Sequence, residues 1–316
     1  MKKAIQQIML GSILKNENQT LDILNTLKNA GYSGIELNCF MLNKTSTFVQ
    51  ALTKLAGMPV GKCARFNWQR LIYESGLGVV AIHFDLGTIE KNFESVIQTA
   101  QLFNTSNIII SGMYKFNYCN KNKVYDLCCR LNAAGKKLRN HNLRLLYHNH
   151  NAEFLHYYNG NTSGWKGTNS NINTLKANLK AESNLCTKAK EVGTFNPYKY
   201  IVQNTNPLFV NFELDVYWVA DAGVNPLDVT ETLGERMKLM HITDRGYRDK
   251  RMFTPIVKQN CIELGQGNFN IPAFIDAAKR QHVEAIILET HKNWINNNPI
   301  ASAQISGDYL NKILNS

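Results

Sequence analysis

The chain lacks the features that mark secreted, membrane-spanning or thiolate-metal proteins. Its 7 cysteines form no CxxC pair and follow no regular spacing, so the sequence predicts neither a disulfide framework nor a zinc knuckle. It has no apolar run of about eighteen residues, and no signal-type apolar segment follows its basic first residues. We therefore expect a cytoplasmic protein without a membrane partner.

Charge is sparse and scattered along the chain. Charged residues make up 19% and hydrophobic residues 44%, which is enough apolar material for a sizeable core. The formal net charge of +11 would favour a polyanionic partner. However, Lys and Arg cluster only briefly, at 136–139 and 245–251, which is typical of solvated surfaces. No nucleic-acid partner is expected.

A GxGxxG turn after the first apolar run is also absent, which disfavours an open dinucleotide-binding sheet. Short runs rich in Ile, Val and Leu instead alternate with segments of helical periodicity, the pattern of a parallel sheet covered by helices. The eight runs are 8–13, 34–37, 79–83, 108–111, 143–147, 208–214, 238–242 and 285–289. Eight strands with interleaved helices predict one α/β domain over residues 1–316, a (β/α)8 TIM barrel.

Helical periodicity is clear at residues 20–30, where Gly31 supplies a residue suited to a left-handed C-cap. Further helices are predicted at 92–103, 121–139, 226–233, 272–280 and 301–314. Two insertions exceed a minimal barrel, one at about 41–76 after the second strand and one at about 155–196 after the fifth. Loops of this length often serve as lids or binding surfaces, and we expect the second to be a lid.

Polar residues stand at the ends of several predicted strands. His83, Asp215, His241 and Glu289 occupy such ends, and the fifth run leads into residues 147–154, YHNHNAEF. In a parallel barrel these ends converge on one mouth. Each residue alone could be a buried histidine bonded to a carbonyl or a carboxylate that caps a helix. Together they would concentrate desolvated charge that a cation must neutralise.

Oxygen and imidazole ligands without a thiolate suit one divalent metal ion, either Mn2+, Mg2+, Co2+ or Zn2+. The residue types do not select among these four ions.

Several blocks of the sequence resemble the xylose-isomerase-like barrels, a family of sugar phosphate isomerases and epimerases. The blocks are 31–37 (GYSGIEL), 147–154 (YHNHNAEF), 213–219 (ELDVYWV), 222–226 (AGVNP), 241–244 (HITD) and 264–270 (LGQGNFN). Together they span nearly the whole chain apart from the two insertions. The resemblance implies a TIM barrel that acts on a small carbohydrate.

The resemblance also implies that Asp215, His241 and Glu289 are metal ligands. For the fourth ligand we favour Glu153, with His148 as its competitor, because many relatives carry a glutamate where this chain has His148. Thr243 stands where the family usually has lysine, so a substrate contact from that position is not expected.

A metal that holds adjacent hydroxyl and carbonyl oxygens of a ketose would acidify the neighbouring C–H and stabilise an enediolate. Glu153 and Glu289 are the candidate acid/base residues, and His83 is expected to bind a substrate hydroxyl or share in proton transfer. Substrate contacts are expected from His150, Trp218, Arg245 and Glu36. The predicted activity is metal-dependent isomerisation or epimerisation of a sugar or sugar phosphate.

Three other functions stay open. The same enolate could expel a β-hydroxyl, which would make the chain a dehydratase of a keto-inositol or a dehydroshikimate-like acid. A barrel that only binds sugar is a second alternative. An apurinic-site endonuclease needs three metal ions, but Trp218 stands where such enzymes carry a second histidine and Ser111 ends the fourth run. The sequence leaves homo-oligomerisation open.

Overall fold

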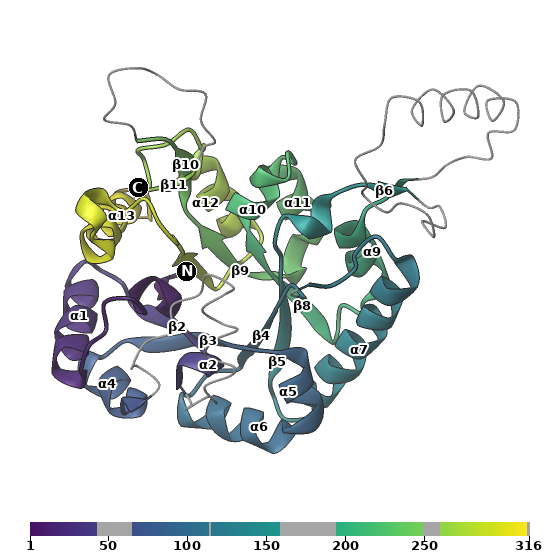
Figure 1. The fold of residues 1–316 in the computed structure, drawn as a ribbon, viewed down its shortest axis with the longest axis horizontal. Helices are drawn as coiled ribbons and strands as arrows, with labels where there is room; N and C mark the ends of the chain where they lie inside the picture. Colours follow the sequence, from purple (N-terminus) through teal and green to yellow (C-terminus); the bar gives the residue numbers. More distant parts are fainter. Residues whose placement is uncertain (43–64, 114, 159–193, 249–259, 315–316) are drawn as a thin grey trace, which may run out of the picture.

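Eight parallel strands close into a barrel in the order β1-β12-β9-β8-β5-β4-β3-β2, with helices around it (Figure 1). The computed structural model describes residues 1–42, 65–113, 115–158, 194–248 and 260–314. The barrel strands are β1 Lys2–Gln6, β2 Gly34–Asn38, β3 Gly78–Phe84, β4 Asn107–Ser111, β5 Arg144–His148, β8 Val210–Asp215, β9 Met237–Ile242 and β12 Ala285–Leu288. The predicted (β/α)8 TIM barrel is confirmed.

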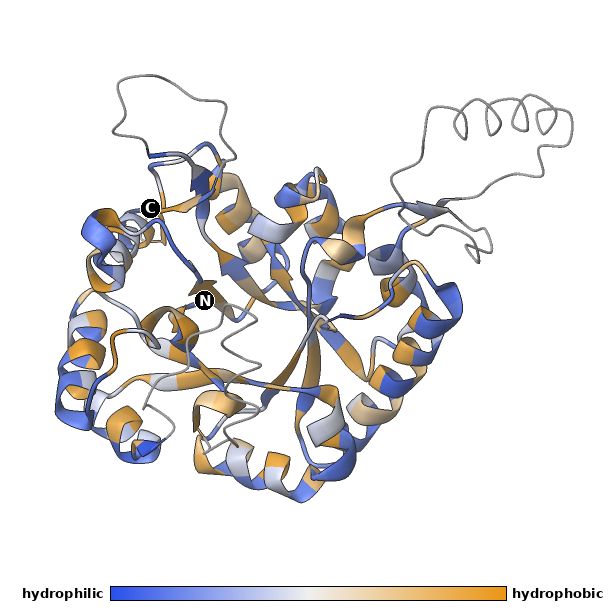
Figure 2. Cartoon of the chain, in the orientation of Figure 1, coloured by the Kyte–Doolittle hydropathy of each residue, from blue (hydrophilic) through white to orange (hydrophobic). Residues whose placement is uncertain are grey.

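Amphipathic helices cover the outside of the barrel, and their apolar residues face the strands (Figure 2). They are α1 Glu17–Asn29, α2 Cys39–Leu42, α4 Trp68–Ser75, α5 Leu86–Lys91, α6 Phe93–Leu102, α7 Lys121–Arg139, α9 Pro197–Asn204, α10 Val216–Asp221, α11 Pro226–Leu233, α12 Ile271–Arg280 and α13 Pro299–Leu314. Short 3-10 turns lie at η1 Gln7–Leu10, η3 Ala152–Phe154, η4 Gly234–Arg236 and η5 Ile295–Asn297. Gly31 follows α1 with a φ of 85°, as its predicted capping role requires.

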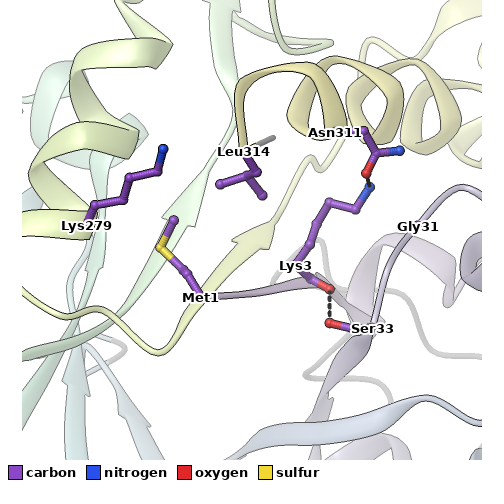
Figure 3. Close-up of a pocket in the computed structure, with 7 residues that line it drawn as sticks. All are labelled: Met1, Lys3, Gly31, Ser33, Lys279, Asn311 and Leu314. Atoms are coloured by element: carbon purple, nitrogen blue, oxygen red, sulfur yellow. Dashed lines mark hydrogen bonds between the residues drawn. The ribbon is translucent and has the colours of Figure 1, made fainter. Parts of the chain in front are cut away.

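The first strand lies earlier than the sequence predicted. The run at 8–13 was expected to be a strand, but β1 comprises Lys2–Gln6 and the turn η1 follows it. Hydrophobicity alone missed this strand because Lys3 and Gln6 are polar yet buried. The Lys3 ammonium donates to the carbonyls of Ala30 and Gly307. It also donates to Asn311 Oδ1 (Figure 3). Tertiary partners therefore satisfy groups that sequence reasoning places in solvent.

Alternation along the strands sorts the barrel interior into tiers. The apolar tier consists of Ala4, Val80, Ala81, Ile109, Leu146, Leu239, Ala285 and Ile287. Two positions further along six of the strands, the next residue on the same side is polar: Gln6, His83, Ser111, His148, His241 and Glu289. We call this polar layer at the carboxyl ends of the strands, together with Glu36 on β2 and Glu213 and Asp215 on β8, the mouth tier.

An ion pair fills the opposite end of the interior. Arg144 at the start of β5 donates to Glu284, just before β12, with Nη2 2.8 Å from Oε2. Asn107 Nδ2 lies 3.5 Å from the same oxygen. Because β9 and β8 separate β12 from β5 in the barrel order, this contact spans the interior. We call these three residues the floor.

A surface pocket also lies at this end, lined by Met1, Lys3, Gly31, Ser33, Lys279, Asn311 and Leu314 (Figure 3). It opens at the start of β1, far from the carboxyl ends of the strands where TIM-barrel active sites lie. It therefore has no place in the candidate site.

Both insertions are described only at their edges. In the first, α2 and α4 stand on either side of residues outside the described ranges, and α4 matches one of the two helical patterns expected there. In the second, β6 Tyr157–Tyr158 pairs antiparallel with β7 Thr194–Phe195. The predicted lid falls mostly on residues 159–193, outside the described part, and stays a prediction. A second antiparallel pair is formed by β10 Asp244–Gly246 and β11 Asn260–Ile262.

Within the described ranges, the helices are too short or too polar to cross a membrane.

Candidate metal centre

Two groups of histidine and carboxylate side chains occupy the mouth tier. In each group the candidate ligand atoms all lie within 4.8 Å of one another. The outer group is His148, Asp215, His241 and Glu289. The inner group is Glu36, His83, Glu213 and His241, all of them buried. His241 belongs to both groups and connects them.

Strand register brings the outer group together. Asp215 on β8 is the register partner of His241 on β9, and Glu289 follows the end of the next strand, β12. His241 Nδ1 lies 2.8 Å from Glu289 Oε2 and 3.9 Å from Asp215 Oδ2. The other oxygen of Asp215 accepts the backbone N–H groups of Tyr217 and Trp218 and so caps α10. The cap fixes the carboxylate with one oxygen directed toward His241.

Glu36 is the hub of the inner group. Its Oε1 lies 2.6 Å from His83 Nε2 and 2.8 Å from His241 Nε2. Gln6 Nε2 donates to the same oxygen at 3.0 Å. His83 uses its other nitrogen to bond Ser111 Oγ at 2.9 Å. Both nitrogens of His83 are therefore occupied inside the barrel.

Glu213 connects the two groups from β8. Its Oε2 is bonded to His148 Nδ1 at 3.0 Å. Its Oε1 lies 3.3 Å from His241 Nε2, close enough for an ion pair but without the alignment of a hydrogen bond. His148 and Glu213 are register partners on neighbouring strands, which explains the short contact.

Oppositely charged neighbours determine the pKa values of the inner group. Burial acts to lower the pKa of His83, but Glu36 and Glu213 outweigh it and raise this pKa to about 10. In the same way, burial acts against protonation of His241, yet the carboxylates around it raise its pKa well above the ordinary value. Burial would raise the pKa of Glu213, but His241 and His148 hold it well below its usual range. Each ionised group thus depends on its partners.

The two outer carboxylates differ from each other. Burial raises the pKa of Asp215 to about 6, and Glu289 nearby acts in the same direction. Burial would also raise the pKa of Glu289, but His291 and His241 outweigh it and lower that pKa below its usual range. Glu289 therefore stays ionised to a lower pH than Asp215 does.

The residues of the two groups fit a bound cation. Together they hold four carboxylates and three imidazoles, so one negative charge remains even if every imidazole is protonated. Among the described residues, the ion pairs of these carboxylates are all with histidines. In addition, Glu36 Oε2 and Glu213 Oε1 are buried without a hydrogen-bond partner. A divalent ion would compensate this charge, so the cluster could hold a metal.

The structure brings His148, and not Glu153, into the outer group. Glu153 follows β5 in the turn η3, away from the strand alternation that directs His148 inward. Its Oε1 accepts from Tyr147 Oη at 3.0 Å, Tyr118 Oη at 3.2 Å and the His150 backbone N–H at 3.3 Å. Burial raises its pKa. The geometry therefore favours the competitor over the residue we preferred from sequence.

Glu36 and His83 both belong to the inner group. Glu36, from which a substrate contact was expected, is 0% exposed. His83, which was expected to bind a substrate hydroxyl or share in proton transfer, is buried beside it, and both roles stay predictions. They lie within hydrogen-bonding distance of each other and of barrel residues. The structure thus places them as neighbours of the candidate ligands.

Aromatic and imidazole rings surround the outer group. The ring of His150 lies 5.2 Å from His148 and 5.8 Å from Trp218, and Trp218 lies 6.5 Å from His291. Burial, together with His148, lowers the pKa of His150 to about 3, so this imidazole is neutral at pH 7. His150 and Trp218 thus lie beside the candidate ligands, where we expected substrate contacts.

Sequence reasoning missed His291 and the role of Glu213. His291 is 43% exposed at its side chain, and its Nε2 lies 3.7 Å from Glu289 Oε1. Glu213 stands two residues before Asp215 on the same strand. This alternation would have placed Glu213 on the same face as Asp215.

The side chains of Arg245 and Thr243 both have partners within the protein. Arg245 Nη1 donates to the Ala220 carbonyl at 2.9 Å, and Nη2 lies 3.7 Å from Asp221 Oδ1. Thr243 Oγ1 donates to the Ile262 carbonyl at 3.2 Å. To make its predicted substrate contact, Arg245 would have to bind the substrate while it also contacts Ala220 and Asp221 at the end of α10.

Asp244 explains why two of the family-like blocks occur together. Its carboxylate accepts backbone N–H groups from Arg245, Gly265, Gly267 and Phe269. It therefore ties residues 241–244 to the turn at 264–270. A side chain at Gly267 would overlap this carboxylate, so glycine is required there.

Comparison with known proteins supports the fold and the family. The model of the xylose isomerase-like TIM barrel family matches residues 24–313. A crystal structure of a sugar phosphate isomerase/epimerase from Parabacteroides distasonis is similar with a TM-score of 0.69 at 18% identity, covering 98% of this chain and 93% of that one. No curated protein sequence matches significantly.

Two further structures share the barrel at lower identity. The probable 3-DHS dehydratase AsbF of Bacillus anthracis matches with a TM-score of 0.60 at 12% identity, covering 100% of this chain and 99% of that one. The IOLI protein with a bound zinc atom matches with a TM-score of 0.59 at 12% identity, covering 99% and 98% of the two chains. At these identities the similarity shows the fold, while the family model covers most of the sequence. The chain belongs to the xylose isomerase-like TIM barrel family.

Proposed function

We propose that this chain is a divalent-metal-dependent isomerase or epimerase of a sugar or sugar phosphate. The observation that carries the proposal is the outer group, in which two imidazoles and two carboxylates meet at the carboxyl ends of the barrel strands. The family and the similarity to a sugar phosphate isomerase/epimerase support the same reaction class. A small carbohydrate is the proposed substrate.

The proposed ligands are His148, Asp215, His241 and Glu289. When bound, the metal would supply Lewis-acid polarisation of the substrate carbonyl. Because two of the four donors are imidazoles, Zn2+, Co2+ and Mn2+ suit the group better than Mg2+, which prefers oxygen ligands and water.

Glu289 is the proposed residue that moves the proton. It stays ionised, as a base must, and its Oε1 lies on the side of the exposed His291. A single carboxylate can carry a proton between adjacent carbons on one face of the substrate, which suffices for isomerisation. Epimerisation needs a second group on the opposite face. Glu153 remains the proposed second group, and its raised pKa suits a proton donor.

The ring wall of His150 and Trp218 is proposed to orient the sugar and exclude water. An apolar ring packs against the C–H face of a sugar, while a neutral imidazole can either donate a hydrogen bond to a sugar hydroxyl or accept one from it.

Dehydration is the second candidate, because the probable dehydratase AsbF shares the barrel over its whole length. The two reactions share the removal of a proton next to a carbonyl and differ in whether a β-hydroxyl then leaves.

The experiment is to load the purified chain with Mn2+ or Co2+ and incubate it with a panel of ketoses and keto-acids in deuterated water. We expect solvent deuterium in a recovered isomer, whereas a new ultraviolet chromophore with loss of water would identify a dehydratase. A chain that binds no divalent ion after reconstitution would contradict the proposal.

A further inference from the structure

We propose that Glu36 and Glu213 are positioning residues that fix which nitrogen each imidazole ligand offers to the metal. In this arrangement His241 binds through Nδ1 and His148 through Nε2. The inference rests on the proposed metal site and adds the residues that orient its ligands.

The contacts of His241 differ on its two sides. Nε2 faces Glu36 at 2.8 Å and Glu213 at 3.3 Å, and both carboxylates are fully buried. Nδ1 faces Glu289 and Asp215, the other carboxylates of the outer group. The enclosed nitrogen is thus held by acceptors that keep its proton, and the nitrogen on the outer side remains for the metal.

His148 has the opposite orientation. Its Nδ1 is bonded to Glu213 at 3.0 Å, which leaves Nε2 for the outer group. The bond follows from strand pairing, because His148 on β5 and Glu213 on β8 are register partners. Glu213 is the acceptor that the structure provides for this nitrogen within the described residues.

Glu36 is held in place by a network of its own. Gln6 Nε2 donates to Glu36 Oε1, while Gln6 Oε1 accepts from Asn38 Nδ2 and the backbone N–H of Ile8, each at 2.8 Å. These bonds fix the direction of the Gln6 amide, since its oxygen is committed to two donors. The amide N–H must therefore point at Glu36, and this bond fixes the position of Glu36 Oε1.

The inner group could instead be a second metal site, since its ligand atoms also lie close together. Its N···O distances of 2.6–3.5 Å include hydrogen-bond lengths, and all four residues are buried. We therefore assign it an orienting role, and metal stoichiometry separates the two possibilities.

The two carboxylates should differ in importance. If Glu36 is replaced by Gln, the amide oxygen can still accept from His241 Nε2, and Glu213 Oε1 remains 3.3 Å from that nitrogen as an ion-pair partner. If Glu213 is replaced by Gln, a single amide oxygen replaces two carboxylate oxygens, and an N–H2 group is turned toward one imidazole. That imidazole must then change its tautomer and present an N–H to the metal.

The experiment titrates the metal-free full-length chain with Co2+ and records both the affinity and the visible absorption spectrum. The variants are Glu213→Gln and Glu36→Gln, with Glu284→Gln on the floor as a matched control. We expect one Co2+ per chain in all proteins. We expect about 10- to 100-fold weaker binding and a shifted spectrum in E213Q, a smaller loss in E36Q and no change in E284Q.

The outcomes separate this inference from the proposed function. If the unaltered chain binds no Co2+, the metal site itself is refuted. If it binds Co2+ and E213Q binds with the same affinity and spectrum, the metal site stands and the positioning role is refuted. Two Co2+ per chain, one of them lost in E36Q, would make the inner group a ligand set and also overturn the inference. Circular dichroism of each variant, with E36Q as the second probe, identifies a variant that fails to fold.

Discussion

The two ends of the barrel interior both contain buried or half-buried charge, but they balance it differently. On the floor, Arg144 meets Glu284 with two parallel hydrogen bonds, so opposite charges compensate within the chain. In the mouth tier, four carboxylates meet three imidazoles, and the apolar tier separates them from the floor. Both ends are polar, but only the floor has equal numbers of opposite charges. The excess of carboxylates over imidazoles therefore distinguishes a candidate ligand site from a structural ion pair.

The largest expected effect is on the mouth side. Replacing Glu289 by Gln should lower solvent deuterium exchange into the substrate by about 10²–10⁴-fold, because both the proposed base and a ligand are lost. Mass spectrometry of the recovered sugar measures the exchange. The floor variant Glu284→Gln removes the same charge and should keep its exchange. Equal losses in both variants would abolish the distinction between the two ends.

The next effect tests the fourth ligand. Replacing His148 by Ala should weaken Co2+ binding by about 100-fold or more, while Glu153→Gln should keep it, because only His148 belongs to the outer group. Isothermal titration measures both affinities. The reverse result would restore Glu153 as the ligand and show that the β5 loop rearranges when metal binds.

A smaller effect concerns the choice of metal. With two imidazole donors, the chain should bind Zn2+ and Co2+ at least about 10-fold more tightly than Mg2+. Competition titrations followed by metal analysis measure this order. Tighter binding of Mg2+ would indicate that the imidazoles are not ligands, and the mouth tier would then resemble an oxygen-only site.

The smallest effect lies on the floor. Replacing Arg144 by Ala should lower the free energy of unfolding by about 0.2–1 kcal/mol, because both side chains of the pair are partly exposed. Metal affinity should not change. Chemical denaturation of both proteins measures the difference, and a loss of metal binding in R144A would show that floor and mouth are coupled.

This floor effect should also depend on pH. Burial would raise the pKa of Glu284, but Arg144 outweighs it and lowers this pKa in the folded chain. The stabilisation is therefore complete above the ordinary glutamate pKa of about 4.3 and is lost as the pH falls through the lowered folded value. The stability difference between R144A and the unaltered chain should shrink over that range. A constant difference would exclude Glu284 as the source.

Much of the barrel could be predicted because each strand buries apolar residues on a regular alternation. The helices α7 and α11 lie at the residues predicted for them. The first strand was missed, since Lys3 and Gln6 are buried only by virtue of distant partners such as Gly307 and Glu36. From sequence alone, a polar residue that is buried against a distant partner cannot be distinguished from one that is exposed to solvent.

The sequence by itself determined the barrel and the strand ends that carry Asp215, His241 and Glu289, because alternation and strand order follow from local pattern. Only the tertiary structure brought His148, and not Glu153, beside Asp215, His241 and Glu289, and placed Glu36 and His83 within the inner group. These contacts join strands that are neighbours or face each other across the barrel. Their distances depend on register and on the turn after β5, and neither can be read from the spacing of residues along the chain.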